Sequence, residues 1–319
     1  MTKPVRTALV LGATGGIGGE TALALARHGW KIRALSRNVA PATSLQGWEW
    51  VKGDSLDRAS IVAAAQGVHA IVHAVNPPGY RNWAALVLPM IENTIAAAKA
   101  AGARILLPGT IYNYGPDAFP VLTEDSPQHP VTRKGAIRVE LEQRLLKASG
   151  SGARVLIVRA GDFFGPGAGN NWFSQGLVKP GPSIKTVSYP GRRGIGHQWS
   201  YLPDVARTMV ELLARREALE SFATFHMAGH WDADGTQMTD AIRRVAVGHS
   251  GHEPHVTSFP WWLVTLASPF VETFRGLREM RYLWRMPLQM DNARLIATLG
   301  YEPHTPLDAA VEATLCSTN

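Results

Sequence analysis

The sequence predicts an α/β fold, with a doubly wound parallel sheet and a smaller C-terminal lobe. From residue 7 to residue 159, short apolar runs alternate with stretches in which apolar residues recur at helical spacing. A glycine-rich segment separates the first apolar run from the first helical stretch. Beyond Gly161 the alternation stops, and glycine, proline, asparagine and aromatic residues crowd the segment 165–196. These three observations indicate one regular sheet domain and one irregular lobe.

The expected elements follow one another without a repeat. The strand Thr7–Leu11, the helix Gly18–His28 and the strand Lys31–Leu35 form a βαβ unit. The alternation then continues through the strand Trp50–Lys52, the helix Arg58–Gln66, the strand Ala70–Val75, the helix Ala84–Ala101, the strand Arg104–Leu107, the helix Lys134–Ala148 and the strand Arg154–Arg159. Parallel strands joined in this way require right-handed crossovers.

Composition excludes several classes of protein. The chain has 319 residues, of which 45% are hydrophobic and 18% charged, so it is neither disordered nor fibrous. The only cysteine, Cys316, cannot form an internal disulfide or a cysteine-based zinc site, which favours a cytoplasmic location. Apolar runs are too short to span a bilayer, and glycines interrupt the N-terminal segment before a signal sequence could form, so we expect no membrane association.

The charge balance favours anionic ligands. The formal net charge is +7, but the basic residues are scattered and never form a run of five or six. We therefore expect an anionic small molecule and no nucleic-acid partner.

A glycine triplet lies between the first expected strand and the first helix. Gly12, Gly15 and Gly18 have the spacing GxxGxxG. Such a turn can present backbone N–H groups and the positive end of a helix dipole to a pyrophosphate. The alternative is a turn whose glycines only permit close packing. We expect a Rossmann-type dinucleotide site that includes Gly12, Thr14, Gly15, Gly16, Ile17 and Gly18.

The residues after the second strand bear on the choice of dinucleotide. An NAD-specific site carries an acidic residue there, whereas this chain has Ser36 and Arg37. The Arg37 guanidinium can stack on adenine and pair with a 2′-phosphate, and Ser36 can donate a hydrogen bond to it. We therefore expect NADP rather than NAD, with an ordinary surface arginine as the alternative.

Further motifs carry a resemblance to a known family. They are Gly53-Asp54, His73-Ala-Val-Asn76, Gly109-Thr-Ile-Tyr-Asn-Tyr-Gly115, Phe164-Gly-Pro-Gly167 and Trp199-Ser-Tyr-Leu-Pro-Asp204. With these motifs the chain resembles, over nearly its whole length, the extended branch of the short-chain dehydrogenase/reductase superfamily, the NAD-dependent epimerase/dehydratase family. The resemblance implies a mainly structural role for Asp204. It also implies cofactor contacts from Asp54, Ser55, His73, Ala74 and Val75.

The chain departs from this family at the catalytic centre. The family places Tyr-x-x-x-Lys on the helix after the fifth strand, often with glycine after the tyrosine and glutamate four residues after the lysine. Aligning Glu142 with that glutamate puts Arg138 on the lysine and Lys134, followed by Gly135, on the tyrosine. A second register puts Lys134 on the lysine and Pro130 on the tyrosine.

The first register suggests a catalytic set. Lys134 and Arg138 share a helix face, so Lys134 can exchange a proton with a substrate while Arg138 binds the cofactor ribose. Thr110 occupies the family's Ser/Thr position and can bind the reacting oxygen. The alternative is a solvated charge pair and a loss of the family's acid/base chemistry.

Substrate contacts and the remaining histidines complete the expectations. In the segment after the last strand, asparagine side chains offer donors and acceptors and aromatic faces suit a sugar ring, and the alternative is a lid without specific contacts. His197 reads as a structural histidine, and the polar loop around His249, His252 and His255 does not read as a metal site, so we expect no metal. The apolar cluster Trp261–Leu266 predicts a core helix. Substrate contacts are expected from Asn76, Tyr112, Asn170, Asn171 and Trp172.

Two functions remain open at the level of sequence. The first is an NAD(P)-dependent oxidoreductase or epimerase/dehydratase-like enzyme acting on a small, anionic, sugar-like or carbonyl substrate. The second is a non-catalytic NADP-binding protein that senses redox state. We expect a dinucleotide-binding domain at 1–165, to which 195–228 returns, and a substrate lobe at 166–194 and 229–319. A homodimer through the helices Ala84–Ala101 and Lys134–Ala148 is expected from the resemblance.

Overall fold

The structure, a computed structural model, describes residues 5–38, 47–77, 82–169, 171–178 and 184–317. The chain divides into two compact units. Unit 1 comprises Met1–Gly109, Ile137–Arg159 and Val205–Phe225, and unit 2 comprises Thr110–Ala136, Ala160–Asp204 and His226–Asn319. The boundaries expected from the sequence for a dinucleotide-binding domain and a substrate lobe stay a prediction.

Unit 1 is built on a seven-stranded sheet with the order β11-β7-β5-β4-β1-β2-β3. Strand β1 pairs in parallel with β2 on one side and β4 on the other, so the strand order reverses there. In such sheets ligands bind at the carboxyl ends of the strands beside that reversal. The strands are β1 (Thr7–Leu11), β2 (Lys31–Ser36), β3 (Glu49–Lys52), β4 (Ala70–His73), β5 (Arg104–Thr110), β7 (Arg154–Ala160) and β11 (Phe222–His226).

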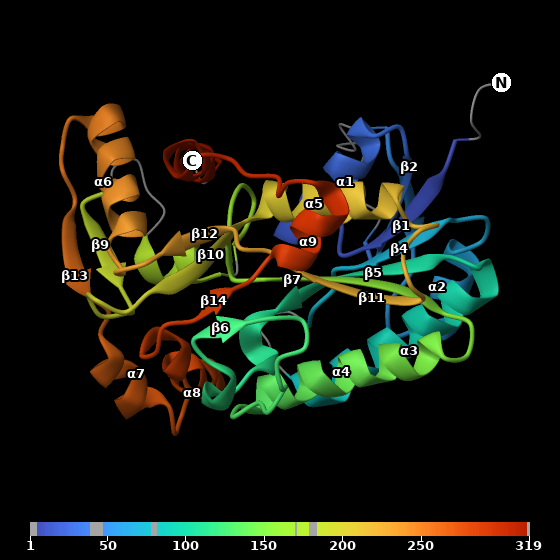
Figure 1. Cartoon of the computed structure of the whole chain (residues 1–319), viewed down its shortest axis with the longest axis horizontal. Coiled ribbons are helices and arrows are strands. Elements are labelled where there is room, and N and C mark those ends of the chain that lie inside the picture. The colour runs from blue at the N-terminus through green and yellow to red at the C-terminus, as the bar shows by residue number, and fades with distance from the viewer. Residues whose placement is uncertain (1–4, 39–46, 78–81, 170, 179–183, 318–319) are drawn as a thin grey trace. The chain divides into compact units, whose positions relative to one another are not determined.

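Helices cover both faces of this sheet. Figure 1 shows α1 (Gly16–Arg27) and α5 (Leu202–Ala214) over one face, and α2 (Arg58–Ala64), α3 (Trp83–Ala101) and α4 (Arg133–Ser149) over the other. Because both faces are covered, the central strands are mostly apolar, and β4 is buried at every position. The predicted doubly wound α/β fold is confirmed.

Local polar groups fix where the helices begin and end. The Asp57 carboxylate accepts a hydrogen bond from the Ala59 N–H at 3.0 Å and caps α2. The Thr132 hydroxyl accepts the Gly135 N–H at 3.0 Å at the start of α4. Helix α3 ends at Gly102, whose φ of 65° favours glycine.

A buried ion pair joins α4 to β7. Arg159 donates from Nη2 to Glu142 Oε2 at 2.6 Å, and the two side chains are 3% and 5% exposed. Gly109 on β5 makes room for this arginine, since a Cβ there would lie 2.5 Å from Arg159 Cγ. The pair therefore fixes the register of α4 against the sheet.

Removing the Glu142 charge should destabilise the protein strongly. In Glu142→Gln the Arg159 guanidinium stays buried without its counter-charge, and we expect a loss of about 3–5 kcal/mol of unfolding free energy, measured by urea titration. Glu140→Gln is the matched control, because Glu140 lies on the same helix in an exposed pair with Arg144. The control should lose less than about 1 kcal/mol. Equal losses in both variants would contradict the assigned role of the buried pair.

The described residues of unit 2 form three small sheets, with orders β12-β10-β8, β13-β9 and β14-β6. Its strands are β6 (Val121–Leu122), β8 (Asp162–Phe164), β9 (Thr186–Tyr189), β10 (His197–Tyr201), β12 (His230–Asp232), β13 (His255–Ser258) and β14 (Gln289–Met290). Its helices are η2 (Ile111–Asn113), η3 (Pro116–Ala118), η4 (Phe173–Leu177), α6 (Gln237–Ser250), α7 (Trp261–Ala267), α8 (Glu272–Glu279), η5 (Met280–Trp284), α9 (Ala293–Leu299) and α10 (Leu307–Cys316). Aromatic rings dominate the core, which includes Phe164, Phe173, Trp199 and Trp284.

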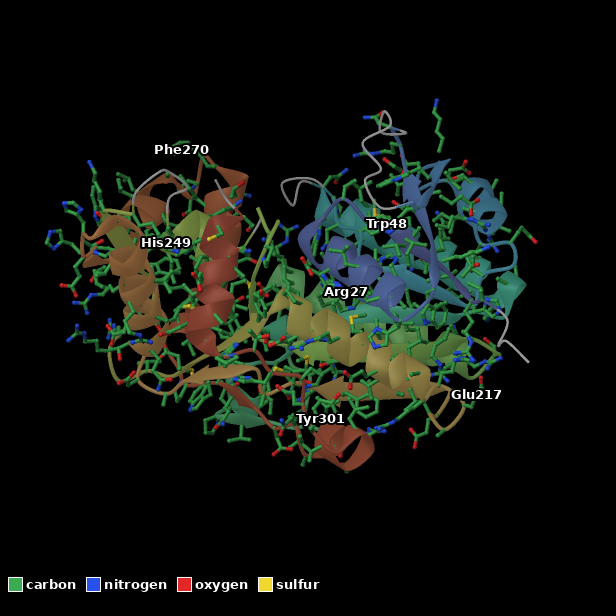
Figure 2. All side chains as sticks on the ribbon, turned by 90° about the horizontal axis from the view of Figure 1, so that it is seen from above. Arg27, Trp48, Glu217, His249, Phe270 and Tyr301 are labelled. Carbon is green, nitrogen blue, oxygen red and sulfur yellow. The ribbon has the colours of Figure 1, made fainter. Side chains whose placement is uncertain are left out.

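Helix α7 differs from its expected position in the core. Trp261 and Val264 are buried, but Trp262 and Leu266 are 67% and 68% exposed. Phe270, labelled in Figure 2, follows this helix and is 87% exposed. The helix is amphipathic in its packing although its sequence is apolar all round, so the expectation of a core helix is correct for one face only. No helix among the described residues is long and apolar enough to cross a membrane.

Candidate functional site

The glycine turn lies against the carboxyl end of β4. Gly12 has a φ of 89°, and a Cβ there would lie 2.5 Å from the Ala74 carbonyl oxygen. A Cβ on Gly18 would overlap the Gly12 carbonyl oxygen. The turn is closed by a hydrogen bond from the Gly15 N–H to that same oxygen at 3.0 Å. Close packing therefore requires glycine at Gly12 and Gly18.

The outer side of the same turn is accessible. Thr14 and Gly15 are exposed, and Gly16 and Ile17 are partly exposed. Helix α1 begins here without a side-chain cap and without an acidic residue in its first turn. The first N–H groups of a helix have no helical acceptor, and the positive end of its dipole attracts anions. The turn thus fits a pyrophosphate as well as the packing that its glycines permit.

The ends of β2 and β3 bring the next predicted residues to this edge of the sheet. Ser36 ends β2 and donates its hydroxyl to the Asn38 carbonyl at 2.6 Å, while Arg37 is exposed. Asp54 follows β3 and is partly exposed, and Ser55 is buried. The carboxyl ends of neighbouring parallel strands share one edge, so these residues lie on the side where a dinucleotide binds.

His73 ends β4 and is fully enclosed. Its Nδ1 lies 2.9 Å from the Thr94 hydroxyl, which itself donates to the Met90 carbonyl at 3.0 Å. Because that hydroxyl has one hydrogen, Nδ1 of His73 is the donor to Thr94. Burial lowers the pKa of His73 to about 3, and the nearby Arg138 guanidinium adds to this shift. The imidazole is therefore neutral at neutral pH.

Arg138 lies beside the segment that follows β4. Its Nη2 donates to Asn76 Oδ1 at 3.3 Å, and its guanidinium carbon lies 5.2 Å from the centre of the Trp83 ring. Arg138 is buried, whereas Ala74 and Val75 are partly exposed. The structure brings this cation to the strand end where the resemblance places the cofactor.

The burial of His73 predicts a loss of stability in acid. The native imidazole resists protonation until about pH 3, whereas the unfolded one titrates near its ordinary value of about 6.5. Below that value the unfolded state binds the extra proton, so unfolding free energy falls by about 1.4 kcal/mol per pH unit between roughly pH 6 and pH 4. In His73→Asn no imidazole is present to bind this proton in the unfolded state. The difference in unfolding free energy between wild type and variant should therefore narrow at that rate as the pH falls, measured by urea titrations across pH.

His252 is exposed, so the variant His252→Asn is the control for the pH dependence of the unfolding free energy. A stability gap for His73→Asn that stays constant from pH 7 to pH 4 would show that His73 is protonated in the native state.

In unit 2, the turn after β5 holds Thr110 and Tyr112. The Thr110 hydroxyl accepts the Tyr112 N–H at 3.4 Å. A Cβ on Gly135 would overlap the Tyr112 carbonyl oxygen, so the start of α4 packs directly on this turn. Lys134 is partly buried, and its ammonium group would lie 3.1 Å from a Cβ built on Gly276 of α8. The start of α4 therefore meets the Thr110 turn within one unit.

Tyr112 also belongs to a buried polar cluster that the sequence analysis missed. Its hydroxyl donates to Asp162 Oδ1 at 3.2 Å, and His197 Nε2 lies 2.9 Å from Asp162 Oδ2. The side chains of His197 and Asp162 are 3% and 4% exposed. The His197 ring stacks on Trp284 with centroids 3.7 Å apart. A carboxylate directly after a long apolar strand was the signal in the sequence that could have identified Asp162.

The remaining predicted substrate residues have local partners. Asn170 lies outside the described residues. Asn171 accepts the Ser174 N–H at 2.8 Å and donates to the Ala168 carbonyl at 3.0 Å. Trp172 is 8% exposed and packs against aromatic rings of the unit 2 core. Substrate contacts of Asn171 and Trp172 stay a prediction.

His249, His252 and His255, which recur every third residue in the sequence, do not lie on one element. His249 is in the last turn of α6 and His255 begins β13. His249 Nε2 lies 3.5 Å from Glu312, and His252 Nδ1 lies 2.8 Å from the Ser250 carbonyl. In the part of the chain that the structure describes, these three histidines do not assemble a group of metal ligands.

Comparisons with known proteins agree with this geometry. A family model described as NAD(P)H-binding matches residues 12–184. No protein with a curated description matches the chain. The match to the family model supports the nicotinamide cofactor that the glycine spacing indicated.

Solved structures of epimerases share the fold. A UDP-glucose 4-epimerase from Brucella ovis in complex with NAD has a TM-score of 0.75 and 16% identity, with 98% of each chain covered. A UDP-glucose 4-epimerase from Bifidobacterium longum with NAD⁺ and UDP has a TM-score of 0.72 and 15% identity, covering 98% of this chain and 97% of that one. A mutant UDP-glucuronic acid 4-epimerase from Bacillus cereus, with NAD and a fluorinated UDP-glucuronic acid, has a TM-score of 0.72 and 17% identity over 98% of each chain. The resemblance drawn from the motifs is confirmed at the level of the fold.

Proposed function

Since the chain belongs to the NAD(P)H-binding family, we propose that it is a nicotinamide-dependent oxidoreductase of the epimerase type that acts on a sugar nucleotide. The observation that carries this proposal is the turn from Gly12 to Gly18, which packs on β4 and leaves the start of α1 open to an anion. The similar structures hold NAD together with UDP or a UDP-sugar in two cases. Because all three are described as epimerases, a non-catalytic role is not favoured.

The residues of the dinucleotide edge fit the cofactor. The N–H groups of Gly16 and Ile17 would hold the pyrophosphate, Asp54 the adenosine and Arg138 the nicotinamide ribose. The nicotinamide would supply reversible hydride transfer at the substrate carbon. The neutral, buried His73 supports the end of β4 without adding charge to this edge.

In this proposal, residues at the start of α4 and in the turn after β5 carry out the acid/base step. Removing a hydride from a carbon that bears a hydroxyl requires a base for the hydroxyl proton. The amine of Lys134 takes that proton and returns it as the ammonium, while the Thr110 hydroxyl binds the same oxygen. Arg138 lies four residues further along the same helix.

The substrate class follows from charge and from the neighbouring structures. A nucleoside diphosphate carries negative charge, which suits a chain with a net charge of +7. Tyr112 and Asn76 offer a phenol and an amide to a sugar ring.

We also propose that the protein forms a homodimer through α3 and α4. Sedimentation of the purified protein would measure whether this dimer is present.

Lys134→Ala should abolish turnover but keep the cofactor. We expect kcat for interconversion of UDP-hexoses, followed by NMR, to fall at least about 100-fold because the proton acceptor is lost. The affinity for the nicotinamide cofactor should stay within about twofold in a binding titration, since Lys134 does not contact the glycine turn in this proposal. Lys147→Ala, an exposed position near the other end of α4, is the control.

The turnover of the variant Tyr112→Phe is measured in the same assay as that of Lys134→Ala. If Lys134→Ala retained turnover and Tyr112→Phe lost it, the proton would pass through the phenol and the role given to Lys134 would be wrong.

Arg37 is proposed to make the site prefer NADP. Its exposed guanidinium pairs with the 2′-phosphate, which NAD lacks. Arg37→Asp should therefore weaken NADP binding at least about tenfold, because a charge-assisted hydrogen bond is lost and repulsion replaces it. Binding of NAD, titrated by calorimetry in the same variant, is the internal control and should change far less. Equal losses for both dinucleotides would refute this preference.

A further inference from the structure

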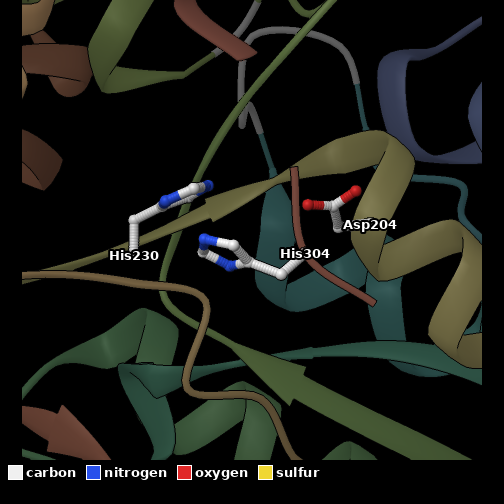
Figure 3. A group of neighbouring side chains, drawn as sticks. All are labelled: Asp204, His230 and His304. Carbon is white, nitrogen blue, oxygen red and sulfur yellow. The ribbon is translucent and has the colours of Figure 1, made fainter. Parts of the chain in front are cut away.

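Three side chains far apart in the sequence converge in unit 2. Asp204 lies in the first turn of α5, His230 begins β12, and His304 lies between α9 and α10. Each offers one ligand atom, and these atoms all lie within 4.8 Å of one another. The two imidazole rings have centroids 4.5 Å apart (Figure 3). The sequence alone gave no expectation of a metal at these positions.

His230 is the most informative member of this group. It is 8% exposed, and its Nε2 is buried with no hydrogen-bond partner. A buried polar nitrogen without a partner costs free energy, and native structures rarely leave one unsatisfied. His230 therefore has a buried nitrogen without a partner, in a group whose ligand atoms all lie within 4.8 Å of one another.

The backbone on both sides of His304 is held in place. The Glu302 carboxylate accepts the N–H groups of Ala228 and Gly229 at 2.8 and 2.7 Å, which ties this segment to the approach to β12. On the other side, Asp204 accepts the Thr305 N–H at 2.6 Å and its hydroxyl at 2.8 Å.

These contacts also orient the carboxylate. The bonds from Thr305 hold the Asp204 carboxylate in place, and a carboxylate oxygen can accept more than one bond. Hydrogen bonds of this kind orient the carboxylate ligands of known metal sites. The three ligands therefore sit on segments that are already fastened to one another.

We propose that Asp204, His230 and His304 form a binding site for a divalent transition-metal ion, with zinc as its best occupant. Two imidazole nitrogens and one carboxylate oxygen suit zinc, cobalt or nickel, whereas calcium and magnesium prefer oxygen ligands alone. Tetrahedral zinc needs ligand atoms about 3.3 Å apart, so the group must contract. The exposed His304 can make that movement by rotating its side chain.

The ion would connect three segments of unit 2. Three protein ligands leave a fourth position for water or for an anionic group. The site needs neither the nicotinamide cofactor nor Lys134, so it stands or falls independently of the proposed enzymatic activity.

The experiment is a zinc titration of the full chain after treatment with a chelator. Calorimetry of the wild type should give one zinc ion per chain, and zinc should raise the melting temperature. His304→Gln removes one ligand at an exposed position, so it should fold normally, and it should weaken zinc binding at least about tenfold. His252→Gln removes an exposed histidine elsewhere and should bind zinc as the wild type does.

Two further measurements keep the result unambiguous. Cobalt substituted for zinc should give intense visible absorption from a tetrahedral site in the wild type, and this absorption should be lost in His230→Gln and His304→Gln. Circular dichroism checks that each variant is folded. Absence of zinc binding to the wild type would overturn the proposal, and so would equal zinc affinity in wild type and His304→Gln.

Discussion

The contact between the glycine turn and the end of β4 is the constraint on which unit 1 depends. A side chain at Gly12 would meet the Ala74 carbonyl, and one at Gly18 would meet the turn itself. Without that contact α1 could not begin where β1 and β4 diverge, and its first N–H groups would not face the carboxyl edge of the sheet. The same two glycines thus pack the turn and position the proposed anion site, so packing and binding are not competing explanations for them.

Helix α4 transmits a second constraint. Glu142 is held by Arg159 in a buried pair, which fixes the rotation of the helix. Once that rotation is fixed, Arg138 one turn earlier must face the end of β4, where it contacts Asn76 and Trp83. The first residues of the same helix belong to unit 2, where Gly135 packs on the Tyr112 carbonyl. A single helix therefore carries both Lys134 and Arg138, the residues that the first register aligns with the tyrosine and the lysine of the family.

How far the sequence could predict this molecule depends on the range of the interactions. The glycine turn, the parallel strands and α4 follow from local spacing, and the structure has them within a few residues of the expected bounds. The aromatic core of unit 2 does not follow, because the burial of Trp172 depends on Trp261 and Trp284, which lie far along the chain. The partial exposure of α7 could not be predicted for the same reason. The sequence of an apolar helix does not indicate which of its faces will pack against another element.

Polar clusters were the hardest features to predict, and they show why the histidine spacing after α6 was uninformative. His249, His252 and His255 are near in sequence but lie on different elements. Asp204, His230 and His304 are distant in sequence, yet the hydrogen bonds of Glu302 and Thr305 draw their segments together. Asp204 was expected to be structural from the resemblance, and its bonds to Thr305 give it such a role. Because those bonds also orient its carboxylate toward the two imidazoles, a structural role and a ligand role are compatible in one side chain.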